Sequence, residues 1–145
     1  MYKNRSRGFT LIELLVVIAI IGILSAVVLA SLNTARSKGS DAAVQSDLAT
    51  IQTQAEMYYG NNANSYASMC TGDGTIVKAL AGVSSANGGT AAVCNSSATA
   101  YAVQGKLSTQ RTSGTADYWC VDSTGTVSKS TTVLAASTYV CPAAN

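Results

Sequence analysis

A long apolar run lies near the N-terminus of this chain. Residues Gly8–Leu24 read GFTLIELLVVIAIIGIL, and no charged residue lies between Glu13 and Arg36. As a helix, the 22 uncharged residues 14–35 would be roughly 33 Å long, enough to cross the core of a bilayer. The basic residues before the run are Lys3, Arg5 and Arg7. We therefore expect the N-terminus to stay inside the cell and the rest of the chain to face outward.

Glu13 is the only acid inside this run. A carboxylate in a membrane-length segment is energetically costly, so its presence indicates a function and requires a partner. A secretory signal peptide would explain the basic start and the small residues around Val28–Ser31, where signal peptidase would cut. A plain single-span anchor would explain the length. Neither explains Glu13, and the run is longer than a typical signal-peptide core.

The start of the run resembles the short-leader prepilins, that is, the type IV pilins and their pseudopilin relatives. A charged leader, a Gly-Phe pair and a Glu fall together here, and the resemblance covers about a quarter of the chain. The family often has a proline in the second half of this stretch, whereas this chain has none before Pro142. Gly22 and Ser25 are the only evident weak points of the helix. The matching residues are Gly8, Phe9, Thr10, Leu11, Ile12, Glu13 and Leu14, followed by aliphatic residues with Gly22.

The resemblance implies that a prepilin peptidase cuts between Gly8 and Phe9 and that the new Phe9 amine is methylated. It also implies that Glu13 pairs with the amino terminus of a neighbouring subunit during assembly. A free α-amine has a pKa near 7.7–8.0 and is largely cationic at neutral pH, which fits this pairing. A buried carboxylate without its partner is costly, so the pair would select the correct stagger between subunits.

The resemblance and the pattern together predict a pilin-like α+β fold, in which a long N-terminal helix packs against a small antiparallel sheet with disulfide-stapled loops. We expect a leader (1–8), an apolar transmembrane and filament-core half-helix (9–35), an amphipathic half-helix (36–60) and a small head domain (61–145). The amphipathic stripe is formed by Val44, Leu48, Ile51, Ala55 and Tyr58.

The helix is expected to bend or break at Gly39-Ser40, with Ser40 or Asp41 capping a restarted helix, and to stop at Gly60–Asn62. Residues 61–97 are predicted to be mostly loop, with a short helix or turn around 76–80. Strands are predicted at 98–106, 118–122 and 126–130, with 138–141 as a further edge strand. Ser123–Gly125 should form a three-residue hairpin loop with a left-handed glycine.

The four cysteines, all beyond the apolar run, indicate a disulfide framework with three possible connectivities. We favour Cys70–Cys94 and Cys120–Cys141, each closing a loop of roughly 20–25 residues and contributing about 2–4 kcal/mol. The second pair is similar to the C-terminal loop bridge of many pilins.

No catalytic, cofactor or metal site is predicted, since the chain has no histidine and its seven acids are scattered. Asp73-Gly74 and Asp122–Gly125 are interpreted as turns, not as calcium loops. Residues 36–145 contain six basic and six acidic residues, so nucleic acid is not expected as a direct ligand. Asn95–Ser97 matches a glycosylation sequon, which is a weak signal. The tyrosines are interpreted as core or interface residues.

The favoured function is a non-enzymatic subunit of a type IV pilus-like filament serving adhesion, twitching motility or DNA uptake. Its expected partners are like subunits, a prepilin peptidase and an assembly platform in the cytoplasmic membrane. The chain would span that membrane once, N-terminus inside, before joining an extracellular or periplasmic filament. The first alternative is a pseudopilin of a type II secretion system, and the second is a secreted binding module released by signal peptidase.

Overall fold

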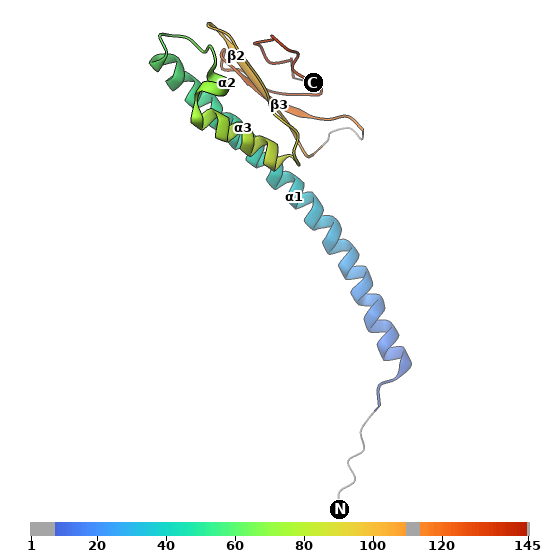
Figure 1. Cartoon of the computed structure of the whole chain (residues 1–145). Coiled ribbons are helices and arrows are strands. Elements are labelled where there is room, and N and C mark those ends of the chain that lie inside the picture. Colours follow the sequence, from blue (N-terminus) through green and yellow to red (C-terminus); the bar gives the residue numbers. More distant parts are fainter. Residues whose placement is uncertain (1–7, 110–113, 145) are drawn as a thin grey trace, which may run out of the picture. The chain divides into compact units, whose positions relative to one another are not determined.

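The computed structural model describes residues 8–109 and 114–144. The chain divides into two compact units, Met1–Arg36 and Ser37–Asn145. The helices and strands along the chain are α1 (Leu11–Asn61), α2 (Met69–Gly72), α3 (Gly74–Ala86), β1 (Val93–Ser96), β2 (Tyr101–Lys106), β3 (Tyr118–Asp122) and β4 (Val127–Ser130) (Figure 1). This arrangement confirms the predicted pilin-like α+β class.

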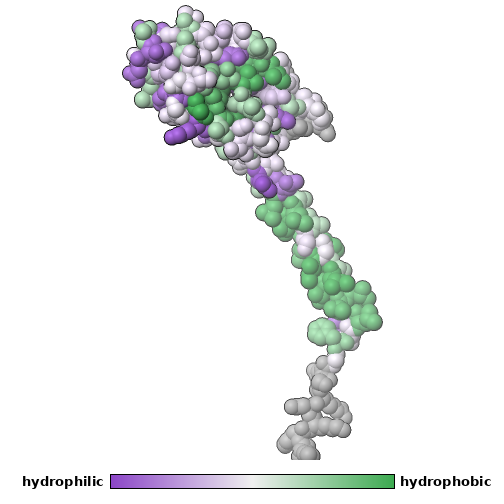
Figure 2. All heavy atoms as spheres, viewed as in Figure 1, coloured by the Kyte–Doolittle hydropathy of each residue, from purple (hydrophilic) through white to green (hydrophobic). Residues whose placement is uncertain are grey.

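In the first unit, α1 is apolar on all of its faces. Every large apolar side chain from Phe9 to Leu32 is exposed, by 47% to 83%, and Figure 2 shows them as an almost continuous green surface along the helix. A helix that is apolar all round is stable only in lipid or inside an assembly. Among the described residues, α1 is long and apolar enough to cross a membrane. The helix continues through Gly22 and Ser25.

In the second unit, the later part of α1 carries the hydrophobic core. Val44, Leu48, Ile51 and Ala55 are completely buried, and Tyr58 packs against the same cluster. These residues recur every three or four positions and therefore lie on one face of the helix. The predicted amphipathic stripe is confirmed, and the helix ends at Asn61, inside the predicted stop.

The predicted break at Gly39-Ser40 is wrong, because α1 runs through both residues without interruption. Asp41 caps no restarted helix. Its buried carboxylate accepts hydrogen bonds from the backbone N–H of Ser108 (2.6 Å) and Thr109 (3.2 Å), and from the Thr109 hydroxyl. A tertiary contact with the chain after β2 thus uses the side chain that the sequence suggested for a cap.

The sheet is antiparallel throughout, with strand order β1-β2-β3-β4. The strands predicted at 98–106, 118–122 and 126–130 are present as β2, β3 and β4, although β2 begins three residues later and β4 one residue later than predicted. The predicted edge strand at 138–141 is wrong, since the structure has no strand there. The fourth strand is instead β1, within the segment predicted to be loop.

The two faces of the sheet are covered differently. Tyr101, Val103 and Val121 point into the core shared with the helices. On the opposite face, Asn95, Gln104 and Asp122 bind residues 131–144, which we call the C-terminal strap. The strap has no regular secondary structure. Both faces of the central strands are therefore covered, which explains why five consecutive residues of β2 are buried.

Side chains of the sheet hold the strap by hydrogen bonds. The Asn95 amide donates to the carbonyls of Ala135 and Thr138, both at 2.8 Å. Gln104 donates to the carbonyl of Thr132 (2.9 Å) and accepts from the N–H of Leu134 (2.7 Å). Within the predicted edge strand, the carbonyl of Thr138 is thus satisfied by a side chain, without a ladder of strand hydrogen bonds.

Both favoured disulfide bridges are present. Cys70–Cys94 joins α2 to β1, with Cα atoms 6.0 Å apart, and Cys120–Cys141 joins β3 to the strap, with Cα atoms 5.7 Å apart. All four cysteines are thereby paired. Each bridge links a short or irregular segment covalently to the sheet, and for the strap it adds to the hydrogen bonds from Asn95, Gln104 and Asp122.

The β3–β4 hairpin is organised by Asp122. One carboxylate oxygen, Oδ1, accepts from the N–H groups of Thr124 and Thr126, and Oδ2 accepts from the N–H of Cys141 (2.8 Å). Burial alone would raise the pKa of Asp122, but these hydrogen bonds hold it below its usual value. Gly125 has φ of +82°, as predicted for the left-handed position of this loop.

Candidate functional site at the start of α1

The start of α1 is a capping box formed by Thr10 and Glu13. The N–H of Glu13 donates to Thr10 Oγ1 (3.2 Å), while the N–H and hydroxyl of Thr10 donate to Glu13 Oε2 at 2.9 and 2.8 Å. This reciprocal exchange satisfies two backbone donors that a helix start leaves free. The sequence signal is Thr-x-x-Glu before an apolar run, a spacing that charge and hydropathy alone do not reveal.

The capping box leaves part of the Glu13 carboxylate open. Both hydrogen bonds from Thr10 go to Oε2, and Oε1 accepts no hydrogen bond from any residue that the structure describes. A carboxylate has about four acceptor positions, so a second, cationic donor can bind without displacing Thr10. Glu13 is thus held in one place and retains acceptor capacity.

The Gly8-Phe9 peptide bond lies before the helix, in exposed chain. Neither residue is helical, Phe9 is 83% exposed, and a Cβ added at Gly8 would meet nothing within 4 Å. Among the residues that the structure describes, none packs over this bond in a way that would block a peptidase. The predicted leader residues Lys3, Arg5 and Arg7 lie outside the described residues. In the uncut chain the Phe9 nitrogen is a peptide nitrogen, so the predicted pair with Glu13 can form only after cleavage.

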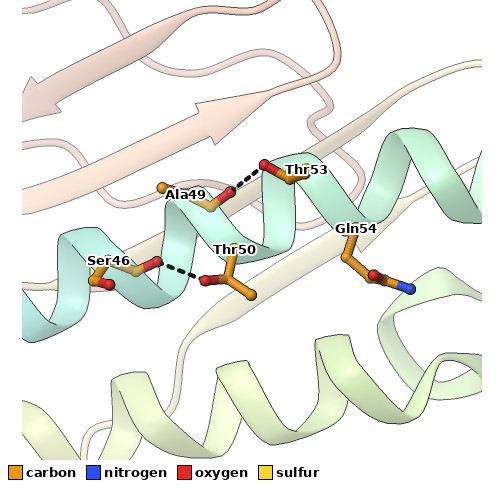
Figure 3. A pocket seen from close by; sticks show the side chains of 5 residues that line it. All are labelled: Ser46, Ala49, Thr50, Thr53 and Gln54. Atoms are coloured by element: carbon orange, nitrogen blue, oxygen red, sulfur yellow. Dashed lines mark hydrogen bonds between the residues drawn. The ribbon is translucent and has the colours of Figure 1, made fainter.

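A second candidate site is a hollow along α1, but most of its polar side chains already form hydrogen bonds within the protein. It has a volume of about 400 Å³ and lies beside Ser46, Ala49, Thr50, Thr53 and Gln54 (Figure 3). The hydroxyls of Thr50 and Thr53 donate to helix carbonyls four residues earlier, and the Gln54 amide donates to Asp73. Few polar groups remain there for a ligand.

The tyrosines of the head form packing contacts. Tyr66 lies between Tyr59 and Tyr101, with ring centroids 4.5 and 5.0 Å away, and its hydroxyl donates to the Glu56 carboxylate. Burial, this hydrogen bond and the negative charge of Glu56 raise the pKa of Tyr66 to about 12. The cluster belongs to the hydrophobic core, in agreement with the interpretation from the sequence.

The aspartates in the predicted turns stabilise local structure. Asp73 is the N-cap of α3 and accepts from the N–H groups of Thr75 and Ile76 at 2.8 and 2.9 Å. These bonds, foremost that from Ile76, lower its pKa. Among the described residues, no group of three or more His, Cys, Asp or Glu side chains is placed to hold a metal ion. The amide of Asn95, in the sequon, is occupied by the two strap carbonyls.

Comparison with known proteins agrees with this geometry. The prokaryotic N-terminal methylation motif matches residues 3–29, which include the Gly8-Phe9 bond, the capping box and most of the apolar run. No solved structure is significantly similar to the chain.

Curated relatives come from two kinds of assembly. The chain is 36% identical over 76 residues to the type II secretion system core protein G of Dickeya chrysanthemi, covering 52% of this chain and 49% of the relative. It is 48% identical over 65 residues to the type IV wide pilus major component PilA4 of Thermus thermophilus, covering 45% and 49%. A further core protein G, from Klebsiella pneumoniae, is 39% identical over 59 residues, covering 41% and 42%.

The chain therefore spans about half the length, or less, of the curated relatives it matches. The predicted resemblance to type IV pilins and pseudopilins is confirmed. Over about half of its length the chain is similar to proteins of both groups, and it has an N-terminal methylation motif on a pilin-like α+β fold.

Proposed function

We propose that this chain is a structural, non-enzymatic subunit of a type IV pilus-like filament. A prepilin peptidase would cut it between Gly8 and Phe9, and it would then polymerise through its apolar helix. The observation that carries the proposal is the start of α1, where an accessible Gly8-Phe9 bond adjoins a capped helix whose apolar side chains are exposed on every face. Such a surface needs lipid before assembly and neighbouring helices after it.

Glu13 would select the register of the filament. After cleavage and methylation, the Phe9 amine of a neighbouring subunit would bind the open Oε1 of Glu13, while Thr10 keeps Oε2 in place. Inside a filament core this pair is shielded from water, and a subunit placed out of register would bury both charges unpaired. The capping box would thus hold the carboxylate ready for its partner.

The precursor would span the cytoplasmic membrane once, with its N-terminus inside, and would be taken up by an assembly platform in that membrane. The filament would then lie outside the cell or in the periplasm. The alternative is a pseudopilin of a type II secretion system, supported by the similarity to core protein G. Abundance in fibres sheared from the cell surface favours the pilus subunit, and absence from them favours the pseudopilin.

The test combines mass spectrometry of the mature N-terminus with three variants. N-methylated Phe9 as the first residue supports the proposal, whereas a start at Ser31 would identify a signal-peptide substrate and refute it. Glu13→Gln removes the charge but keeps a side chain that can close a capping box. Thr10→Ala keeps the charge of Glu13 but removes the capping hydroxyl. Glu13→Ala removes both the charge and the side chain that closes the box.

We expect the two Glu13 variants to be inserted and cut normally but incorporated into filaments on the order of tenfold less or worse, because the neighbouring amine is left unpaired. Thr10→Ala should assemble much closer to the parent chain. Normal filament yield from Glu13→Gln would show that the charge is not needed and would refute the register mechanism.

A further inference from the structure

A polar groove of about 310 Å³ lies in the head between α2, the edge strand β1 and the C-terminal strap. Its volume is at the lower end of the range of small-molecule sites, roughly 300–1,000 Å³. None of its lining residues is charged, and the Cys70–Cys94 bridge forms part of its wall. The hydroxyl-bearing residues that line it are Ser68, Thr71, Ser96, Ser137 and Tyr139.

Most of these hydroxyls make no hydrogen bond to the described part of the protein. Among the described residues, the side-chain oxygens of Ser68, Ser96, Ser137 and Tyr139 make no hydrogen bond, and that of Thr71 has only a long one of 3.4 Å to the Ser68 carbonyl. In the hollow along α1, by contrast, the two threonine hydroxyls are bonded to the helix. The groove therefore presents several neutral donors and acceptors to solvent in a small space.

The walls of the groove are fixed before any ligand binds. The disulfide ties α2 to β1, and the two hydrogen bonds from Asn95 hold the strap beside β1. Ser68 and Ser137, on opposite segments, both have left-handed backbones, with φ of +64° and +60°. Residues other than glycine adopt this conformation at a cost and do so often at ligand sites. A prearranged site loses less conformational entropy on binding.

We propose that this groove binds a neutral saccharide. An anionic ligand would call for Lys or Arg, which are absent from the lining, and an apolar ligand would leave the hydroxyls unpaired. A sugar ring offers many hydroxyls that exchange hydrogen bonds with Ser, Thr and Asn oxygens, and an apolar C–H face that packs on an aromatic ring. Tyr139 is the aromatic residue of the groove and supplies that ring. The proposal goes beyond the filament function and does not depend on it.

The experiment is an NMR titration of the full-length chain in micelles of a detergent without a sugar head group. The probes are D-glucose, D-galactose, D-mannose, N-acetyl-D-glucosamine and the trisaccharide maltotriose, with glycerol as a polyol control. We expect at least one sugar to shift the amide signals of residues 68–71, 94–96 and 137–139 in a saturable way, and glycerol to shift none. Binding of single sugars indicates a terminal residue as ligand, and binding of maltotriose alone indicates an internal chain segment.

Two pairs of variants separate binding from folding. Tyr139→Ala should raise the Kd about two- to tenfold, while Tyr118→Ala, at a partly buried tyrosine outside the groove, should not change it. Ser137→Gly removes a hydroxyl at a backbone conformation that glycine accepts, and Ala63→Gly is the matched control at another left-handed position.

Absence of saturable shifts with all five sugars would overturn the proposal, as would equal Kd values for Tyr139→Ala and the parent chain. Shifts of the groove signals that depend only on protein concentration would also overturn it, since they would assign the groove to a contact with a second copy of the chain.

Discussion

The close packing of β2 against the helices makes a strong prediction at Gly105. A Cβ added there would lie 2.8 Å from Val83 Cγ1, 2.9 Å from Val44 Cγ1 and 3.4 Å from Leu48 Cδ1. Ordinary contacts of a Cβ are 3.4–4 Å, so both valines would have to move by about 0.5 Å or more. Both are completely buried and branched at Cβ, which leaves them little freedom to turn. We therefore expect Gly105→Ala to lower the free energy of unfolding by about 1–3 kcal/mol.

The measurement is thermal or denaturant unfolding of the full-length chain in micelles, followed by the fluorescence of its single tryptophan, Trp119, which packs against the core. Each kcal/mol should lower the Tm by about 4–8 °C for a head of this size. The matched control is Gly39→Ala, inside α1 with nothing within 4 Å of the new Cβ, which should stabilise by about 0.5–1 kcal/mol.

A double-mutant cycle with Val83→Ala tests the cause. Val83→Ala alone should destabilise the head, but it also makes room beside residue 105, so the combined loss should be smaller than the sum of the two single losses. If Gly105→Ala is neutral, or if the losses simply add, the close approach of β2 to Val83 is not what requires a glycine.

Three other predictions concern the strap. The pKa of Asp122 is lowered in the folded state, so the stability that this carboxylate contributes is present above pH about 3.9 and is lost as the pH falls through the folded-state pKa. The free energy of unfolding of Asp122→Asn should therefore change less between about pH 2 and 5 than that of the parent chain. Asn95→Asp replaces a donor to two carbonyls by an acceptor, which should weaken the attachment of the strap by about 1–3 kcal/mol. The measurement is proteolysis, which should cut within residues 131–144 faster than in the parent chain. Replacing Cys120 and Cys141 together by serine should cost about 2–4 kcal/mol, measured by denaturant unfolding.

Local pattern predicted those parts of the fold that depend on periodicity. The spacing of Val44, Leu48, Ile51 and Ala55 identified the buried face of α1, because a helix repeats every 3.6 residues whatever it packs against. The β3–β4 hairpin followed from Ser123–Gly125 for a similar reason, since the turn is determined by its own residues.

Features that depend on distant partners were not predictable. Asp41 was suggested as a cap, but its acceptors face Ser108 and Thr109, 67 and 68 residues further on. Strand β1 carries a weak local signal and exists because β2 pairs with it and Cys70 is bonded to Cys94. At the candidate site, Gly8, Phe9 and Glu13 follow from the motif; the Thr-x-x-Glu spacing also indicates the capping box, and the structure adds that Thr10 binds Oε2 alone and leaves Oε1 open. The leader cleavage, the methylation and the boundaries of the four predicted segments stay predictions.

The way the strap is attached has a consequence for how this protein can diversify. Four side chains of the sheet bind backbone groups of the strap: Asn95, Gln104, Asp122 and Ser128. Every amino acid has the carbonyl, and every one except proline has the N–H. The path of residues 131–144 is therefore specified independently of most of the strap's own side chains. Exposed positions such as Val133 can accept substitutions without loss of the fold, so related chains can present different surfaces on one scaffold.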